Sequence, residues 1–404
     1  MHVTVLGAGV TGITTAYYLT ELGHSVTVID GAAEVAAGAS GGNGGQLSYS
    51  FTDAFASPAL LRKLPGQVFG FDSAIRIRPA INKSLLKWGV AFVGQCTRKN
   101  ARNNTAFVLE LALQSAHLLK QIRNTVAMDF SFRQAGKLVM LNNPGELESA
   151  KKSQLLKQVQ GCKTEILSLS KACEIEPGLL GFKQAYLGAV WSKQDEVGCP
   201  KKFCQNLCQW MLETRPFELR LNETILSIEP RNGKLVQITT SAGSFEPDAM
   251  VVCLGANSSS LLDPLGIETN IYPVRGYSVT LPLGTAPIET SVTDLGNKIV
   301  FSRLGDQIRI AGMADIVGFN SKRDPQRLRQ LLEIAHSLAP TVADFNATQD
   351  HGWGGYRPMT PDSRPLVGST PVKGVFLNTG HGMLGWTLAC ATGNQVAKQL
   401  HSTI

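Results

Sequence analysis

Three glycines near the start of the chain have a spacing that suits the binding of a dinucleotide. Gly7, Gly9 and Gly12 form a G-x-G-x-x-G pattern directly after a short apolar run. In such a turn the first glycine permits a sharp bend, the second lets the backbone approach a pyrophosphate, and the third lets the next helix pack on the sheet. Asp30 ends the following apolar run, at the distance expected of an acid that binds a ribose hydroxyl. FAD and NAD both use this unit, so the pattern leaves the choice between them open.

A polar loop and a second group of glycines add to this prediction. The loop 39–48, ASGGNGGQLS, is too polar for a core and suits close approach of the backbone to a flat or charged ligand. Gly380, Gly382 and Gly385 surround the expected start of the last helix, so free N–H groups can face an anion there. A flavin gains negative charge at its pyrimidine edge on reduction and a nicotinamide does not, so this spacing favours a flavin.

The length of the chain predicts that two domains position these residues, because 404 residues are more than one hydrophobic core usually contains. The apolar run 248–255 ends in glycine, as a strand that returns to the cofactor sheet would. Further strands are expected at 2–6, 25–29, 137–141, 165–169, 185–191, 217–221, 224–229, 235–240, 271–282, 298–312 and 375–378, and helices at 13–21, 103–126, 146–159, 326–338 and 386–400. The middle of the chain mixes short strands with a lysine-rich helix, which is typical of an α+β domain.

The positive charge of the chain is concentrated in one stretch. The formal net charge is +7, and residues 62–102 contain nine basic residues and one acid, Asp72. Apolar residues lie between these charges, but their runs are far shorter than the roughly 20 residues of a membrane-spanning helix. Two interpretations of the basic amphipathic segment 60–102 stay open. In the first, the segment lies on a membrane surface with its lysines toward anionic lipid. In the second, it is a solvated face of helices that covers the substrate site.

The cysteines and the start of the chain indicate a reduced, cytoplasmic protein without a metal. The eight cysteines include no C-x-x-C pattern. Cys199, Cys204 and Cys208 cluster without a histidine, which favours core packing over metal binding. Because the expected cofactor strand begins at residue 2, no room is left for a secretory signal. We therefore expect a cytoplasmic location, with peripheral contact to the inner face of the cell membrane through segment 60–102.

Several segments resemble the D-amino acid oxidase-like flavoproteins. The segments VTVLGAGVTGITTAYYLTELGHSVTVID, SGGNGGQLS, YPVRGYSVTL, IRIAGMADIVGFN, YRPMTPDSRP and LNTGHGMLGWTLACATG are similar to blocks of that family, occur in the same order and span nearly the whole chain. The first is shared by many flavoproteins, whereas the last three are more specific. The resemblance implies an α/β fold: a Rossmann-type FAD-binding domain plus an α+β substrate domain with a mostly antiparallel sheet. We place the FAD-binding domain at 1–52, 195–265 and 348–404, and the substrate domain at 53–194 and 266–347.

The resemblance also implies FAD as the cofactor and oxidative deamination of D-amino acids as the reaction. The Cα–H of a small or cyclic substrate, such as D-alanine or D-proline, passes as hydride to flavin N5, and electrons go on to a quinone-type acceptor. The 2-oxo or imino acid is the product. Arg357 is the implied carboxylate anchor, since a guanidinium pairs with a carboxylate through two hydrogen bonds. Tyr277 is the second carboxylate contact, His381 lies beside the flavin, and Arg275 either joins them or ties its strand to a neighbour.

The residues that we assign to FAD binding come from both ends of the chain and from two internal positions. They are Gly7, Gly9, Val10, Gly12, Asp30, Ser40, Gly45, Gln46, Leu47, Ile225, Gly255, Gly380, Gly382, Met383, Gly385 and Thr387. Two features depart from the family pattern. The chain ends at Ile404, without the longer tail of some relatives, and Ser363 stands where a glycine is expected after Arg357. The first puts in doubt any acceptor contact made by such a tail.

Other functions stay open at this point. An oxidase of the same fold would pass electrons to oxygen, and D-hydroxyproline is an alternative substrate. An RNA-modifying flavoprotein suits the net charge, but no nucleic-acid motif accompanies it, so nucleic acid is an improbable partner. A non-catalytic FAD-binding protein is a further alternative. The sequence leaves undetermined the preferred amino acid, the physiological acceptor, the oligomeric state and whether the flavin is covalent.

Overall fold

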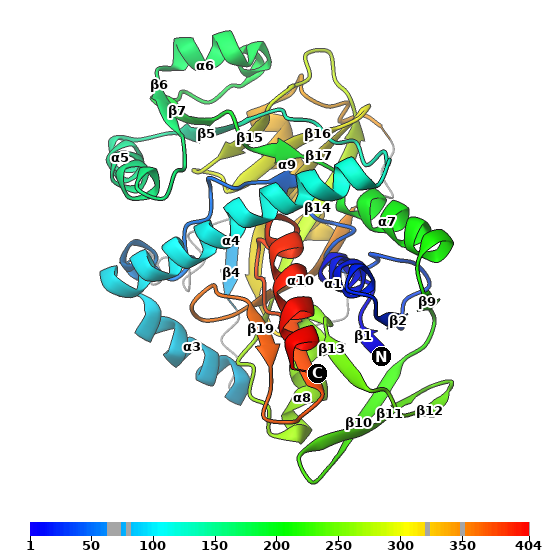
Figure 1. Ribbon diagram of the computed structural model, residues 1–404. Helices are drawn as coiled ribbons and strands as arrows, with labels where there is room; N and C mark the ends of the chain where they lie inside the picture. The colour runs from blue at the N-terminus through cyan, green and yellow to red at the C-terminus, as the bar shows by residue number, and fades with distance from the viewer. Residues whose placement is uncertain (63–73, 78–81, 320–323, 348–351, 404) are drawn as a thin grey trace.

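The computed structural model describes residues 1–62, 74–77, 82–319, 324–347 and 352–403. Two large sheets organise these residues, and the first contains both the first strand, β1, and the last strand, β20 (Figure 1). This first sheet has six strands in the order β19-β20-β13-β1-β2-β9. The strands are β1 (His2–Leu6), β2 (Ser25–Ile29), β9 (Phe217–Arg220), β13 (Ala249–Val252), β19 (Leu366–Ser369) and β20 (Val375–Thr379). All neighbours pair in parallel except β19, which runs antiparallel to β20.

The central strands of this sheet are buried on both faces, because alternate side chains enter two different cores. Val3 and Val5 pack with four helices, whereas Leu6 packs with a small sheet on the other face. The helices are α1 (Val10–Glu21), α4 (Arg98–Thr125), α7 (Pro200–Thr214) and α10 (Gly385–Ser402). The small sheet consists of β10 (Ile225–Arg231), β11 (Lys234–Thr240) and β12 (Gly243–Phe245), and α8 (Ser258–Leu262) lies beside it.

The second sheet has nine strands in the order β18-β14-β17-β16-β15-β5-β7-β6, with β4 joined to β17. Its pairs are antiparallel apart from β5 with β15 and β4 with β17. Helix α9 (Pro325–Leu338) packs on it through Leu328, Leu331 and Ala335. The strands are β4 (Ile75–Ile77), β5 (Lys137–Leu141), β6 (Glu165–Leu167), β7 (Gly188–Ser192), β14 (Tyr272–Pro282), β15 (Ser291–Asp294), β16 (Ile299–Leu304), β17 (Gln307–Ile316) and β18 (Trp353–Met359).

Shorter elements join and cover these layers. Strands β3 (Gln46–Leu47) and β8 (Glu196–Val197) form a two-stranded ladder. Helix α3 (Lys83–Gln95) lies at the outside of the molecule and packs inward through Trp88 and Phe92 (Figure 1). The other elements are the helices α5 (Pro144–Gln158) and α6 (Leu169–Ile175) and the 3₁₀ turns η1 (Pro177–Gly181), η2 (Gly255–Asn257) and η3 (Asp263–Leu265).

The predicted fold class is confirmed, and the second sheet is mostly antiparallel as expected. The domain boundaries stay a prediction, but two elements pack with the sheet or core of the domain other than the one to which the boundaries assign them. Strand β18 falls in the range 348–404, yet it pairs with β14 in the nine-stranded sheet. Helix α4 falls in the range 53–194, yet its apolar face joins the core around β1 and α10. Both differences arise from long-range packing, which local periodicity does not reveal.

Candidate active site

A cavity of about 1230 Å³ lies between the two sheets. Its wall on one side is formed by the β1–α1 turn, the loop 37–44 and the first turn of α10. The nine-stranded sheet forms the other side, with side chains from β5, β14, β15, β16, β17 and β18. Both groups of glycines that the sequence singled out therefore face one shared space.

The turn after β1 leaves the start of α1 open toward this cavity. Gly7 has a φ of +108°, and a Cβ on it would lie 2.7 Å from the carbonyl oxygen of Cys253. A Cβ on Gly12 would lie 1.8 Å from the Gly7 carbonyl oxygen, so only glycine lets α1 pack here. Gly9 is the N-cap of α1 and has no side chain that could cap the helix. Gly9 and Val10 line the cavity, which gives an anion access to the positive end of the helix.

Asp30 lies beside this turn at the end of β2. Its Oδ2 accepts a hydrogen bond from the backbone N–H of Ala8 at 2.7 Å, and its Oδ1 accepts one from the N–H of Ala32 at 2.8 Å. These two bonds fix the carboxylate at the cavity wall. Each carboxylate oxygen can accept a further hydrogen bond, so the geometry is compatible with a ribose hydroxyl as donor.

The glycine-rich loop is held against the nine-stranded sheet. Ser40 accepts a hydrogen bond from the N–H of Val10 at 2.9 Å, which ties the loop to α1. Arg309 on β17 donates to the carbonyl oxygens of Gly41 and Asn43 at 3.0 and 2.8 Å. A Cβ on Gly42 would lie 1.9 Å from the ring of Trp353, so the loop and β18 touch through a glycine. The loop is therefore a thin, rigid wall of the cavity.

The start of α10 presents a second open helix end. Gly380 and Gly382 have positive φ values of 78° and 56°, which produces the bend before the helix. Leu384 is the N-cap of α10, and its side chain makes no capping hydrogen bond. Gly385 and Thr387 of the first turn line the cavity. The loop is fixed from β18, because the N–H of Gly382 donates to the Pro358 carbonyl oxygen at 2.9 Å.

Two helix N-termini that face one large cavity fit the size and charge of FAD. The N-terminus of α1 suits the pyrophosphate, and the N-terminus of α10 suits the pyrimidine edge of a flavin ring. The cavity is large enough for a ligand of this size, since drug-sized molecules occupy roughly 300–1,000 Å³. The residues present are therefore consistent with the predicted cofactor.

Arg357 extends from β18 into the cavity wall, where it is half-buried. Its Nη1 donates to the carbonyl oxygen of Met313 at 2.8 Å, and its Nη2 lies 3.4 Å from that of Gly312. Burial lowers the pKa of Arg357 to about 10, and the charge of Asp315 opposes this shift. Within the part of the chain that the structure describes, no carboxylate lies within ion-pair distance of Arg357. A half-buried cation that faces a cavity with only carbonyl partners is a strong site for an anion.

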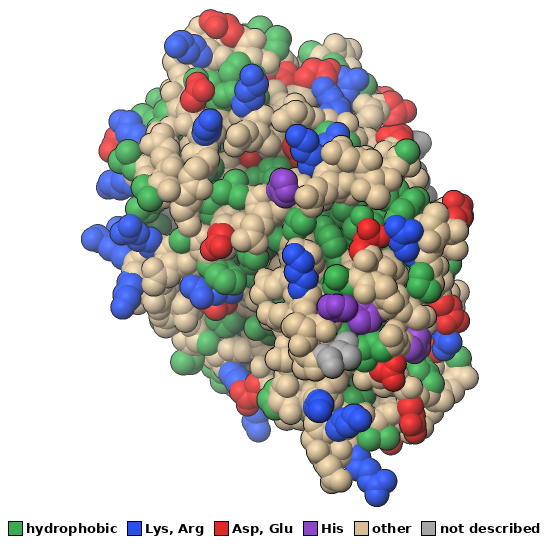
Figure 2. Space-filling model, viewed as in Figure 1, with side chains coloured by type: hydrophobic (Ala, Val, Ile, Leu, Met, Phe, Trp, Pro, Cys, Tyr) green, Lys and Arg blue, Asp and Glu red, His purple; other side chains and the backbone are tan. Residues whose placement is uncertain are grey.

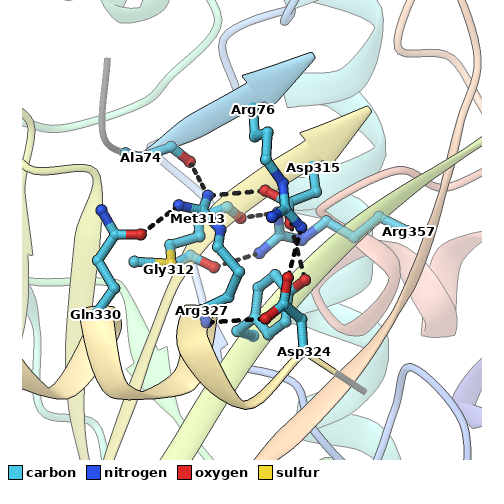
Figure 3. A network of polar contacts seen from close by, with 10 residues as sticks. Ala74, Arg76, Gly312, Met313, Asp315, Asp324, Arg327, Gln330 and Arg357 are labelled. Atoms are coloured by element: carbon cyan, nitrogen blue, oxygen red, sulfur yellow. Dashed lines mark hydrogen bonds and ion pairs between the residues drawn. The ribbon is translucent and has the colours of Figure 1, made fainter. Parts of the chain in front are cut away.

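Asp315 organises the charges next to Arg357 (Figure 3). This carboxylate on β17 is fully buried and accepts hydrogen bonds from Arg76 at 2.6 Å and Arg327 at 2.7 Å. The hydroxyl of Tyr277 donates to the same group at 2.8 Å. Burial and Asp315 both raise the pKa of Tyr277 well above its ordinary value, so the phenol keeps its proton. That proton is directed to Asp315, which leaves only the lone pairs of Tyr277 for another partner.

The other two residues predicted for substrate contact have different surroundings. His381 lines the cavity, and its Nε2 lies 2.9 Å from the Thr392 hydroxyl of α10. Burial lowers the pKa of His381 to about 3, so its ring is neutral at physiological pH. Arg275 is buried but does not line the cavity, and its guanidinium lies 5.4 Å from the ring centre of Tyr356 on the neighbouring strand. This position agrees with the second interpretation of Arg275, in which it ties β14 to β18.

The structure brings most of the predicted residues to the cavity. Those in its wall are Gly7, Gly9, Val10, Asp30, Ser40, Gln46, Ile225, Gly255, Tyr277, Arg357, His381, Gly382, Met383, Gly385 and Thr387. Those that support the wall from behind are Gly12, Gly45, Leu47, Arg275 and Gly380. Sequence reasoning missed Lys137, Arg309, Asp315 and Trp353, whose roles depend on sheet register. Cys204 and Cys208 lie in the hydrophobic core beside α1.

Comparisons with known proteins were consistent with this site. A family model described as FAD dependent oxidoreductase matches residues 2–399. The chain is 36% identical over 407 residues to D-amino acid dehydrogenase 2 of Ralstonia nicotianae, covering 98% of this chain and 96% of that protein. It is 34% identical to the D-amino acid dehydrogenase of Vibrio cholerae, over 99% of this chain and 95% of that protein. The solved glycine oxidase from Geobacillus kaustophilus has the same fold, with a TM-score of 0.76, 20% identity and coverage of 99% and 94%.

Proposed function

The chain belongs to the family of FAD dependent oxidoreductases, and on this premise we propose that it is a dehydrogenase that deaminates D-amino acids oxidatively. The observation that carries the proposal is the guanidinium of Arg357, which lines the FAD cavity with carbonyl partners alone among the described residues. The relatives named as D-amino acid dehydrogenases match nearly the whole chain, which supports the same reaction class.

The residues of the chain divide the work of this reaction. Bound FAD supplies the acceptor for the electron pair and the hydrogen that leave Cα. Arg357 binds the substrate carboxylate and so fixes the orientation of Cα in the cavity. Tyr277 contributes differently from our expectation of a second carboxylate contact. Because its proton is held by Asp315, we assign its oxygen to accept a hydrogen bond from the substrate amine.

The experiment that tests this proposal is anaerobic reduction of the purified yellow protein by matched D- and L-amino acids. Bleaching of the flavin absorbance by D-alanine or D-proline, and not by the L-isomers, is the expected result. Arg357→Ala should retain FAD but bind substrate about 2–5 kcal/mol more weakly, as expected for loss of a buried charged partner. Arg329→Ala, an exposed arginine on α9, is the matched control. Equal apparent affinity in Arg357→Ala and Arg329→Ala would remove Arg357 from the site.

We further propose that the electrons pass to a quinone-type acceptor at a membrane surface, and α3 supports this. Leu86, Val90 and Val93 recur at helical spacing and are 59%, 74% and 48% exposed. Lys83 is exposed on the same helix, which suits contact of α3 with anionic lipid, whereas Lys87 pairs with Glu268 at 2.8 Å. Arg76 does not contribute to this surface, because it pairs with Asp315 and Asp324. Lys63, Asp72 and Arg78 of the basic segment lie outside the described residues.

The helices and the surface charge limit how the protein can contact a membrane or a nucleic acid. No helix in the described part of the chain is long and apolar enough to cross a membrane. Figure 2 shows Lys and Arg side chains spread over one whole face with acidic side chains among them. On this face the mixed charge does not form the continuous basic surface that nucleic acid requires.

Vesicle binding tests the surface, and product analysis tests the acceptor. Val90→Gln with Leu86→Gln should reduce co-sedimentation with anionic vesicles while flavin reduction by D-alanine is unchanged. Leu155→Gln with Val159→Gln, exposed on or beside α5, is the matched control. Equal sedimentation of both pairs would reject α3 as the contact. Stoichiometric hydrogen peroxide would instead favour the oxidase alternative, and faster reduction by D-hydroxyproline would identify that substrate.

A further inference from the structure

Lys137 is a buried cation in the cavity wall that the proposed substrate contacts do not use. It is the first residue of β5, is 2% exposed and lines the cavity. Its neighbours across the sheet are Ser192 on β7 and Ser291 on β15. Because both neighbours are small, the lysine side chain has space to cross the face of the sheet toward the loop that contains Gln46.

The partners of Lys137 are neutral. Its Nζ donates to Oε1 of Gln46 at 2.6 Å and to the hydroxyl of Ser48 at 2.9 Å, and lies 5.0 Å from the ring centre of Phe51. The charge of Asp195 raises the pKa of Lys137, but the hydrogen bonds of that carboxylate come from Ser50 and Ser192. No ion pair of Lys137 occurs among the residues that the structure describes.

A buried ammonium without a carboxylate partner is costly, so its charge needs another source of stabilisation. Burial lowers the pKa of Lys137 to about 8, and Asp195 opposes the shift while Lys157 adds to it. Lys137 therefore remains largely charged at neutral pH. An anion in the cavity would supply the missing partner.

The position of Lys137 identifies which anion this is. Its partner Ser48 donates through its N–H to the hydroxyl of Thr387 at 3.2 Å, in the first turn of α10. The Thr387 hydroxyl in turn lies 3.5 Å from the carbonyl oxygen of Gln46. Lys137 thus lies at the end of the cavity where α10 begins, which is the end assigned to the flavin ring rather than to the pyrophosphate.

The substrate carboxylate is a poor candidate for the same anion. The guanidinium of Arg357 contacts carbonyl groups of β17, and β17 is separated from β5 by β16 and β15. At the usual strand spacing this corresponds to roughly 14 Å, more than the length of a small amino acid. A substrate held by Arg357 through its carboxylate therefore leaves Lys137 to the cofactor.

We propose that Lys137 is an electrostatic residue for the bound flavin: together with the N-terminus of α10, its ammonium stabilises the negative charge that the ring gains when it accepts electrons. The reduction potential of the flavin is raised in consequence. Gln46 and Ser48 position the ammonium through their hydrogen bonds. The inference rests on FAD occupying the cavity as in the proposed function, but it does not depend on which amino acid is oxidised.

The test is the reduction potential of the bound flavin, measured by photoreduction against a reference dye without substrate. Lys137→Met should lower the potential at pH 7 by at least a tenfold change in the two-electron equilibrium constant, about 30 mV. Lys137→Arg, which keeps the charge, should remain closer to the parent protein. Lys157→Met is the matched control, because Lys157 is also a buried lysine but pairs with Asp53 and is absent from the wall of the cavity.

The outcomes separate this inference from the proposed function. A protein that takes up no FAD would refute the proposed function before Lys137 is considered. Holoproteins of Lys137→Met and Lys157→Met with the same potential as the parent would overturn the role of Lys137 while leaving the proposed function intact. If Lys137→Met does not retain flavin, Lys137→Gln, an uncharged residue that can still donate hydrogen bonds, provides the same comparison.

Discussion

Replacing Asp315 by alanine should destabilise the protein more than the same replacement of an exposed acid in the β16–β17 hairpin. Asp315 is fully buried and accepts from Arg76, Arg327 and Tyr277 (Figure 3). Removing one partner of a buried ion pair typically costs about 3–5 kcal/mol, because the remaining charge is left uncompensated. The loss of stability therefore depends on which hydrogen-bond partners Arg76 and Arg327 retain when Asp315 is removed.

The remaining contacts place the expected cost at the lower end of that range. Arg76 keeps Asp324 at 2.9 Å and its side chain is 32% exposed, so water reduces its penalty. Arg327 is almost fully buried and keeps neutral acceptors, Gln330 and the carbonyl oxygen of Ala74. We expect a loss of about 3 kcal/mol in the free energy of unfolding, roughly a hundredfold in the unfolding equilibrium.

Urea unfolding at pH 7, followed by far-ultraviolet circular dichroism, measures this change. Asp306→Ala is the matched control, since Asp306 is exposed in the β16–β17 turn and should change stability by less than about 0.5 kcal/mol. Asp315→Asn, which retains the shape of the side chain, should fall between the two. A loss below about 1 kcal/mol in Asp315→Ala would refute the view that this carboxylate holds the charges together.

Two further predictions concern His381 and the glycines. Burial lowers the pKa of His381 to about 3, so below about pH 6.5 the unfolded chain binds a proton that the folded protein does not. Stability should therefore fall by about 2 kcal/mol from this residue between pH 7 and pH 5, and urea unfolding at both values should show a smaller fall in His381→Gln. Gly42→Ala would place a Cβ 1.9 Å from Trp353 and should weaken FAD retention. Gly89→Ala on α3 meets no atom within 4 Å and should leave FAD absorbance unchanged while raising the melting temperature. An equal loss of stability between pH 7 and pH 5 in the parent protein and in His381→Gln would contradict the first prediction. Full FAD content in Gly42→Ala would contradict the second.

The sequence was sufficient for those parts of the site that depend on local spacing. The turn at Gly7, Gly9 and Gly12 and the bend before α10 could be predicted because each is made by glycines a few residues apart. The run 248–255 was expected to return to the cofactor sheet, and β13 lies in that sheet, paired with β1 and β20. In these cases the same short segment determines both the backbone and the ligand contact.

The residues that tertiary pairing brings together could not be found in this way. Asp315 meets Arg76 across 239 positions of sequence, and Lys137 meets Gln46 across 91. No local period predicts such contacts, because they depend on the register of strands in the second sheet. The same limit explains Tyr277, whose hydroxyl direction follows from Asp315 and was not apparent from the segment RGYS.

The link between β18 and the loop before α10 limits how this protein can be recombined with its relatives. The carbonyl oxygen of Pro358, one residue after Arg357, accepts from the N–H of Gly382, and Met359 pairs with His381. A chimera joined after Met359 would therefore combine Arg357 with a loop before α10 that comes from a different protein. A chimera joined at residue 348 would keep that link but mismatch β18 with β14. Grafts that exchange substrate preference should consequently transfer β14, β18 and the segment through Gly385 as one piece.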